Sequence, residues 1–126
     1  MKKQIFLFIM ILMVLSIITG CSPKEASIEN VSREKAKELI ETEEVAVIDV
    51  RTQEEYNNGH IPGAHLLPLD QLESQLDDLN KDQPYLIVCE TGNRSLQASK
   101  QLLDNGFNHI YNMENGMNAW SYEIER

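Results

Sequence analysis

Cysteine, basic side chains and long apolar runs are all scarce in this sequence of 126 residues. Lysine and arginine number 11 against 20 acidic side chains, which gives a net charge of −9 at pH 7. Such an acidic chain argues against nucleic acid as a partner and against a polybasic contact with anionic lipid. The one long apolar run, from Ile5 to Ile18, is shorter than the roughly 20 residues that a membrane-spanning helix needs. The length suits one domain.

The first 20 residues differ in composition from the rest and resemble a secretory signal peptide. Lys2 and Lys3 precede the apolar run, and small residues follow it before Cys21. A short apolar run behind a basic start is typical of such signals. An uncleaved N-terminal anchor is the alternative interpretation, and we favour the signal because the run is short.

The segment Ile18-Thr19-Gly20-Cys21 resembles the bacterial lipobox. The resemblance implies that a diacylglycerol is attached to the Cys21 sulfur and that cleavage follows Gly20. Several acyl chains would hold the protein on a membrane without spanning it. We therefore expect an extracytoplasmic protein that is lipid-anchored to a bacterial membrane. Its expected parts are a lipoprotein signal peptide over residues 1–20, a lipidated tether over residues 21–27 and a domain over residues 28–126.

Lipidation of Cys21 leaves Cys89 as the one remaining thiol, because the sequence contains two cysteines. Cys89 then has no partner for an internal disulfide. Disulfides are favoured outside the cytoplasm, so a lone thiol there calls for a reason. Cys89 is either an inert buried residue or a reactive one.

Short β-rich runs alternate with helical patterns after residue 28. The strongest runs, Val45–Ile48 and Tyr85–Val88, are of the kind that is buried on both faces of a parallel sheet. Weaker strands are expected over residues 28–31, 65–67 and 110–111, and a last helical turn over residues 117–122. Helical patterns follow three N-cap candidates, which are Ser32, Thr52 and Asp70, and a further helix is expected to begin at Ser95. This alternation predicts an α/β domain with a mainly parallel central sheet flanked by helices on both faces.

Cys89 follows the second strong run, so we expect it at the carboxyl end of a strand, where α/β sheets bind ligands. The loop Cys89-Glu90-Thr91-Gly92-Asn93-Arg94 leads into a helix that is expected to begin at Ser95. Backbone N–H groups of such a loop converge on an anion, and the helix N-terminus and Arg94 add positive charge. These groups would lower the pKa of a cysteine from about 8.5 to roughly 3.5–7.5. An ordinary turn after a buried core cysteine is the alternative, and the spacing alone leaves both open.

Four segments carry motifs of one known family, in the right order from about Val31 to Trp120. They are Val47-Ile48-Asp49-Val50-Arg51 with Glu54-Glu55-Tyr56, Gly59-His60-Ile61-Pro62-Gly63-Ala64, Cys89 to Ser95, and Asn115-Gly116-Met117 to Trp120. On these motifs the chain resembles a single-domain rhodanese, a member of the thiosulfate sulfurtransferase family. The resemblance implies the rhodanese-like α/β fold.

The resemblance also implies a two-step sulfur transfer. The Cys89 thiolate attacks the outer sulfur of a donor such as thiosulfate or a persulfide, and the sulfur then passes to cyanide, a thiol or another acceptor. A protein persulfide is a further donor to consider. No metal and no organic cofactor is implied, and we expect a monomer. The expected substrate-binding residues are Glu90, Thr91, Gly92, Asn93, Arg94 and Ser95, whose N–H groups and guanidinium would hold an anionic donor.

Other motif residues are expected to support the site. Asp49 and Arg51 are expected to form an ion pair behind the loop. His60 is expected to be structural, bonded to nearby backbone, because an ionised thiolate needs no general base. Tyr56 and Trp120 are expected to pack in the core or in a lid.

Glu90 departs from the family pattern, because many members have a neutral or basic residue directly after the nucleophile. If its side chain points to solvent, the effect is small. If it lines the mouth of the pocket, its carboxylate repels a dianionic donor, and the donor is then a neutral or protein persulfide rather than thiosulfate.

Two alternative functions are weighed against the sulfurtransferase. Cell-cycle dual-specificity phosphatases share the fold, but their C-x5-R loop is one residue longer than the span from Cys89 to Arg94. A membrane-tethered binding or redox-sensing module without turnover is the other alternative. The intact Cys89, Gly92 and Arg94 argue against a decayed site.

Overall fold

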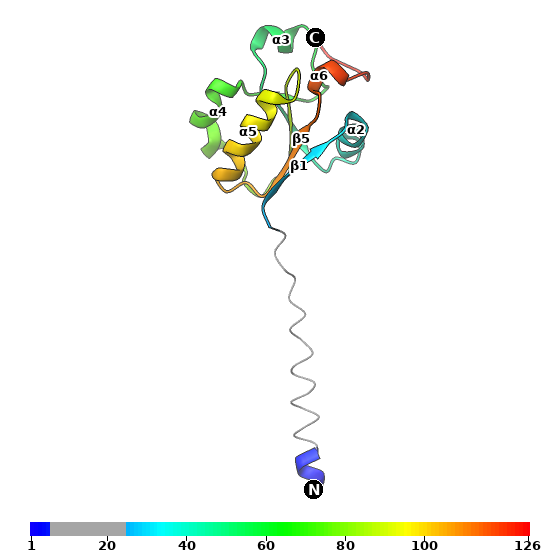
Figure 1. Cartoon of the computed structure of the whole chain (residues 1–126), viewed down its shortest axis with the longest axis vertical. Helices are drawn as coiled ribbons and strands as arrows, with labels where there is room; N and C mark the ends of the chain where they lie inside the picture. The colour runs from blue at the N-terminus through cyan, green and yellow to red at the C-terminus, as the bar shows by residue number, and fades with distance from the viewer. Residues whose placement is uncertain (6–24) are drawn as a thin grey trace.

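A five-stranded sheet forms the centre of the domain in the computed structural model, which describes residues 1–5 and 25–126 (Figure 1). The spatial order is β1-β5-β4-β2-β3, and every neighbouring pair is parallel. The strands are β1 (Ser27–Val31), β2 (Ala46–Asp49), β3 (His65–Leu66), β4 (Tyr85–Val88) and β5 (His109–Met113). The α/β prediction is confirmed, with a sheet that is entirely rather than mainly parallel.

The predicted lipid attachment at Cys21 lies outside the described residues, as does most of the predicted signal peptide. Over residues 1–5 and 25–126, no helix has both the length and the apolar character needed to cross a bilayer.

Helices cover both faces of the sheet, as predicted. Helices α4 (Leu69–Gln75) and α5 (Asn93–Asp104) pack on one face, and the short η1 (Leu76–Asp78) follows α4. Helix α2 (Arg33–Glu41) packs on the other face. The short helices α3 (Gln53–Asn57) and α6 (Gly116–Ala119) lie at the top of the view in Figure 1.

Strand β4 runs through the middle of the sheet, and all four of its side chains are buried. Leu86 and Val88 join the apolar cluster on the α2 face, whereas Ile87 and Cys89 join the cluster on the α4 and α5 face. This alternation explains why the run is apolar throughout, since neither face of the strand meets solvent. The same alternation places the Cys89 side chain on the α4 and α5 face of the sheet.

Two of the three predicted N-caps are confirmed. Ser32 accepts a hydrogen bond from the backbone N–H of Lys35. Thr52 and Glu55 form a reciprocal capping box at the start of α3.

The third predicted cap, at Asp70, is wrong, and so is the predicted start of the helix at Ser95. Asp70 lies in the first turn of α4, where its charge suits the helix dipole, and the N-cap position is held by Pro68. Helix α5 begins at Asn93 rather than at Ser95, because Gly92 in a left-handed conformation holds the N-cap position. The predicted last helical turn is also shifted, since α6 spans Gly116–Ala119 rather than residues 117–122.

Candidate active site

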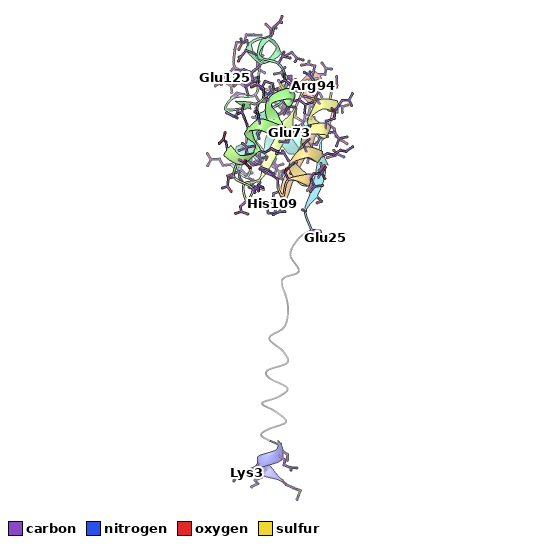
Figure 2. The ribbon with its side chains drawn as sticks, turned by 90° about the vertical axis from the view of Figure 1, so that its left-hand side faces the viewer. Lys3, Glu25, Glu73, Arg94, His109 and Glu125 are labelled. Atoms are coloured by element: carbon purple, nitrogen blue, oxygen red, sulfur yellow. The ribbon has the colours of Figure 1, made fainter. Side chains whose placement is uncertain are left out.

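Cys89 lies directly after β4, at the carboxyl end of the parallel strands, as predicted. Figure 2 shows Arg94 of the same loop and Glu125 toward one end of the domain, with His109 and Glu25 at the other. The loop therefore opens at the end of the domain that faces away from Glu25. Cys89 itself is 0% exposed.

The sulfur of Cys89 is held by groups of its own loop. The backbone N–H of Gly92 donates to Sγ over 3.1 Å, and the Ser95 hydroxyl oxygen lies 3.4 Å from Sγ. Burial is the largest influence on the thiol and raises its pKa. Hydrogen bonds from the Ser95 hydroxyl and from the backbone of Ser95, Gly92 and Thr91 more than offset it, so the pKa of Cys89 is lowered from its ordinary value. The Gly92 N–H is thus one of the predicted loop N–H groups that contacts the sulfur.

The turn before α6 holds this loop from behind. Met117 donates its backbone N–H to the Cys89 carbonyl oxygen at 2.8 Å, and Asn118 donates to the Glu90 carbonyl oxygen at 3.0 Å. This approach requires Gly116, because a Cβ at that position would overlap the Cys89 carbonyl oxygen. Gly116 also has φ +53°, in the left-handed region that favours glycine. The motif Asn115-Gly116 thus has a steric reason that its sequence alone did not reveal.

Arg94 is bound by a carboxylate of a different element. Its two terminal nitrogens donate to the two carboxylate oxygens of Glu55 over 2.8 and 2.7 Å, which is a bidentate pair. The hydrogen bond from Arg94, with others from the Thr52 cap, lowers the pKa of Glu55 to about 2. The predicted anion-binding cation is therefore already paired. Sequence reasoning assigned Glu55 to the helix cap and missed this partnership, which spans 39 residues of chain.

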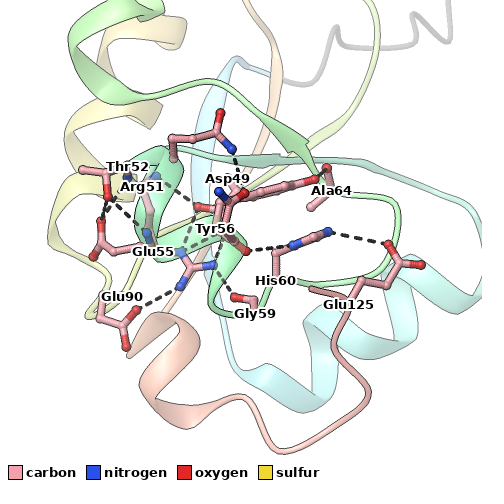
Figure 3. Close-up of polar contacts among 12 residues, drawn as sticks. Asp49, Arg51, Thr52, Glu55, Tyr56, Gly59, His60, Ala64, Glu90 and Glu125 are labelled. Carbon is pink, nitrogen blue, oxygen red and sulfur yellow. Dashed lines mark hydrogen bonds and ion pairs between the residues drawn. The ribbon is translucent and has the colours of Figure 1, made fainter.

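Arg51 is buried and saturated with acceptors (Figure 3). It donates to both carboxylate oxygens of Asp49 and to the Gly59 carbonyl oxygen, which confirms the predicted ion pair. Its remaining terminal nitrogen donates to Glu90 over 3.1 Å. Glu90 is 37% exposed and lines an open hollow of about 420 Å³ beside the loop, so it does not simply point to solvent.

His60 has the structural role predicted for it. Its Nδ1 bonds to the Tyr56 carbonyl oxygen at 2.9 Å, and its ring stacks on the Tyr56 ring with centroids 3.6 Å apart. Tyr56 in turn donates its hydroxyl to the Ala64 carbonyl oxygen, and Trp120 donates its indole N–H to the Glu123 carbonyl oxygen. Both aromatic side chains pack against the cluster on the α2 face, as expected.

Thr91 and Asn93 are exposed at the tip of the loop. A second open hollow of about 520 Å³ lies beside Arg94 and is lined by Val50, Leu69, Asp70 and Glu73 among others. In residues 1–5 and 25–126, no three His, Cys, Asp or Glu side chains are grouped as the ligands of a metal ion would be.

Comparison with known proteins places the chain in a family. The model of the rhodanese-like domain matches residues 32–123. The chain is 33% identical over 102 residues to the thiosulfate sulfurtransferase GlpE of Pseudoalteromonas translucida, covering 78% of this chain and 97% of the relative. It is also 33% identical over 105 residues to a longer Bacillus subtilis protein, of which it spans 57%. The crystal structure of a rhodanese-like domain protein from Staphylococcus aureus superposes with a TM-score of 0.70 at 37% identity, covering 77% of this chain and 96% of the other.

Proposed function

The chain belongs to the family of rhodanese-like domains, and from that premise we propose that it is a sulfurtransferase that carries sulfur on Cys89 as a persulfide. The observation that carries this proposal is the cradle around Sγ. A buried thiol with a lowered pKa, held by the Gly92 N–H and Ser95, is poised as a thiolate nucleophile.

The loading step forms one bond and breaks another. The Cys89 thiolate attacks the outer sulfur of the donor, a bond forms between Sγ and that sulfur, and the donor's sulfur–sulfur bond breaks. The electron pair of that bond leaves with the rest of the donor, which is sulfite when the donor is thiosulfate. The loop N–H groups then stabilise the negative charge of the persulfide. An acceptor thiol or cyanide attacks the outer sulfur and returns Cys89 to the thiolate.

Access to the sulfur requires movement of the loop. Cys89 is 0% exposed, so in this proposal a donor reaches Sγ when the tip of the loop, residues 91–93, shifts outward. Met117 and Asn118 hold the carbonyl groups of Cys89 and Glu90 in place, and Gly92 provides a flexible backbone position beyond them. The clamped base keeps Cys89 positioned while the tip moves.

The proposal is tested by turnover of the purified chain with thiosulfate or an organic persulfide as donor and cyanide as acceptor, with thiocyanate as the product. We expect thiocyanate with the native chain and none above background with Cys89→Ser. Cys89→Ser is close to isosteric and keeps a hydrogen-bonding atom at the same place, so circular dichroism serves as the check on folding. A folded native chain that produces no thiocyanate from either donor would favour the tethered binding module without turnover.

A phosphatase assay tests the alternative that the chain acts on phosphate esters. Hydrolysis of p-nitrophenyl phosphate should be absent, because the span from Cys89 to Arg94 is a C-x4-R loop and Arg94 is engaged by Glu55. Cys89-dependent release of phosphate would overturn the assignment to sulfur chemistry.

We also propose that Cys21 carries the lipid that its lipobox-like sequence predicts and that the domain is held outside the cytoplasm. Metabolic labelling with a fatty acid in a bacterial host tests this directly. Label should be incorporated into the native chain and lost in Cys21→Ala, with Cys89→Ala as the matched control. Equal labelling of native chain and Cys21→Ala would contradict the anchor.

A further inference from the structure

The two cations of the site are already occupied by acids of the same chain. All three guanidinium nitrogens of Arg51 donate to acceptors within the protein, and both terminal nitrogens of Arg94 donate to Glu55. A donor anion would have to displace Glu90 or Glu55 to gain a bidentate contact. The two arginines therefore have fewer free hydrogen-bond donors for an incoming anion than two unpaired guanidinium groups would have.

Carboxylates outnumber the arginines around one hollow and equal them in number around the other. The hollow beside Glu90 is lined by Arg51, Glu55 and Glu90, and the hollow beside Arg94 by Arg51, Arg94, Asp70 and Glu73. Asp49 adds a further buried carboxylate against Arg51. Whichever side a donor enters, it meets a surface with at least as many negative charges as positive ones.

The charge of the donor decides how strongly these carboxylates repel it. Attack of a thiolate on thiosulfate brings a dianion to an anion, so three negative charges share the loop during transfer. Attack on a protonated organic persulfide, R–S–SH, brings one negative charge. In that reaction the Sγ–sulfur bond forms, the RS–S bond breaks, and its electron pair leaves as the thiolate RS⁻. Repulsion from Glu90 and Glu55 acts on the first reaction far more than on the second.

The hollow beside Glu90 also has room for an organic group. Its lining includes the side chains of Met117, Trp120 and Ile124, and its volume is about 420 Å³. Thiosulfate has no apolar part to contact these side chains, whereas the R group of a persulfide has one. Charge and shape thus favour the same class of donor.

We propose that Glu90, together with Glu55, is a specificity-determining residue that disfavours dianionic donors, so that the site loads from organic persulfides in preference to thiosulfate. This inference rests on the proposed function. It concerns only which donor loads Cys89, since the acceptor enters after the first leaving group has gone.

The test measures the second-order rate constant for loading sulfur onto Cys89, by quenched mass spectrometry of the purified chain. The donors are thiosulfate, a small alkyl persulfide whose alkyl group carries no charge, and a peptide bearing a cysteine persulfide. We expect either persulfide to load at least about tenfold faster than thiosulfate, and the faster of the two identifies a small-molecule or a protein source.

Two variants test whether Glu90 and Glu55 determine the donor preference. Glu90→Gln should raise the thiosulfate rate constant by about five- to tenfold and change the alkyl persulfide constant by less than about twofold. Glu55→Gln, which retains a residue type suited to the capping box, should act in the same direction. Glu41→Gln removes the same charge from the exposed far end of α2 and should change neither constant.

The dependence of the loading rate on salt concentration distinguishes charge repulsion by Glu90 from a purely structural role of this residue. Added salt should speed thiosulfate loading of the native chain by screening repulsion, and should speed it less in Glu90→Gln. If the ratio of the persulfide to the thiosulfate rate constant is the same in the native chain and in Glu90→Gln, the proposed role of Glu90 is overturned. If thiosulfate loads the native chain as fast as the persulfides do, the donor preference is overturned. The proposed function stands in both cases. Loading by none of the three donors would overturn the proposed function and this inference with it.

Discussion

The carbonyl oxygen of Cys89 accepts a hydrogen bond from the backbone N–H of Met117 at 2.8 Å, so the first turn of α6 positions the residue that bears the reactive sulfur. The two residues are far apart in the chain and belong to different motifs. Their contact joins the end of β4 to the turn that follows β5, and the loop between Cys89 and α5 is held at its base as a result.

Gly116→Ala should break this arrangement. The added Cβ overlaps the Cys89 carbonyl oxygen, and φ +53° strains any side chain, so we expect a loss of about 3 kcal/mol in the free energy of unfolding and at least a tenfold slower loading of Cys89. Gly63→Ala is the matched control, since Gly63 has φ +76° but no atom within 4 Å of a Cβ. It should lose only about 1 kcal/mol, from backbone strain. Equal losses in urea unfolding of the two variants would show that close packing of Gly116 is unimportant.

The reactivity of Cys89 should depend on pH through its thiolate. Because hydrogen bonds lower its pKa, the rate of alkylation should rise with pH through a midpoint below that of a free cysteine. Ser95→Ala removes the hydroxyl 3.4 Å from Sγ and should move this midpoint to higher pH. Ser99→Ala is the control, since the Ser99 hydroxyl donates to the Ser95 carbonyl oxygen rather than to sulfur. A midpoint that stays unchanged in Ser95→Ala would contradict this account of the pKa.

Asp49→Asn should destabilise the domain strongly. Asp49 is 1% exposed and is the main partner of buried Arg51, so the substitution leaves a cation in the interior with only Glu90 to compensate it. We expect a loss of about 3 kcal/mol in the free energy of unfolding, measured with urea. Glu41→Gln, which breaks the exposed pair with Lys37, should leave the unfolding midpoint nearly unchanged. A similarly small effect of Asp49→Asn would refute the supporting role of this pair.

The Arg94–Glu55 pair should contribute to stability only while Glu55 is ionised. The pKa of Glu55 in the folded chain is about 2, below its ordinary 4.5, so the contribution is complete above pH about 4.5 and is lost as the pH falls toward 2. The difference in free energy of unfolding between the native chain and Glu55→Gln should shrink over that interval. Glu34, whose pKa is also about 2, titrates in both proteins and cancels from the difference. A difference that is constant from pH 6 to 2.5 would contradict the ion pair.

The strands and the position of Cys89 could be predicted because they depend on local pattern. The run Tyr85–Val88 is apolar at every position, which reports burial on both faces without any knowledge of its neighbours. The Thr52–Glu55 capping box is likewise a relation over three residues. The predicted cap at Asp70 and the predicted helix start at Ser95 were wrong because Pro68 and Gly92 hold the N-cap positions, without a side-chain hydrogen bond.

The partners of the site's charges could not be predicted, because they depend on how distant segments meet. Arg94 was expected to bind an anionic donor, yet its guanidinium pairs with Glu55 of α3. Glu90 was left open between solvent and pocket mouth, and its contact with Arg51 places it at the hollow. Both contacts span 39 residues, a separation at which a single sequence gives no signal of pairing.

The central claim is that Cys89 accepts a sulfur atom, and the mass of the chain after incubation with thiosulfate or an organic persulfide tests it most directly. The account predicts a gain of about 32 Da on the peptide that contains Cys89, removed by cyanide or a reducing thiol and absent in Cys89→Ser. An unmodified Cys89 with both donors, or the same gain persisting in Cys89→Ser, would contradict it.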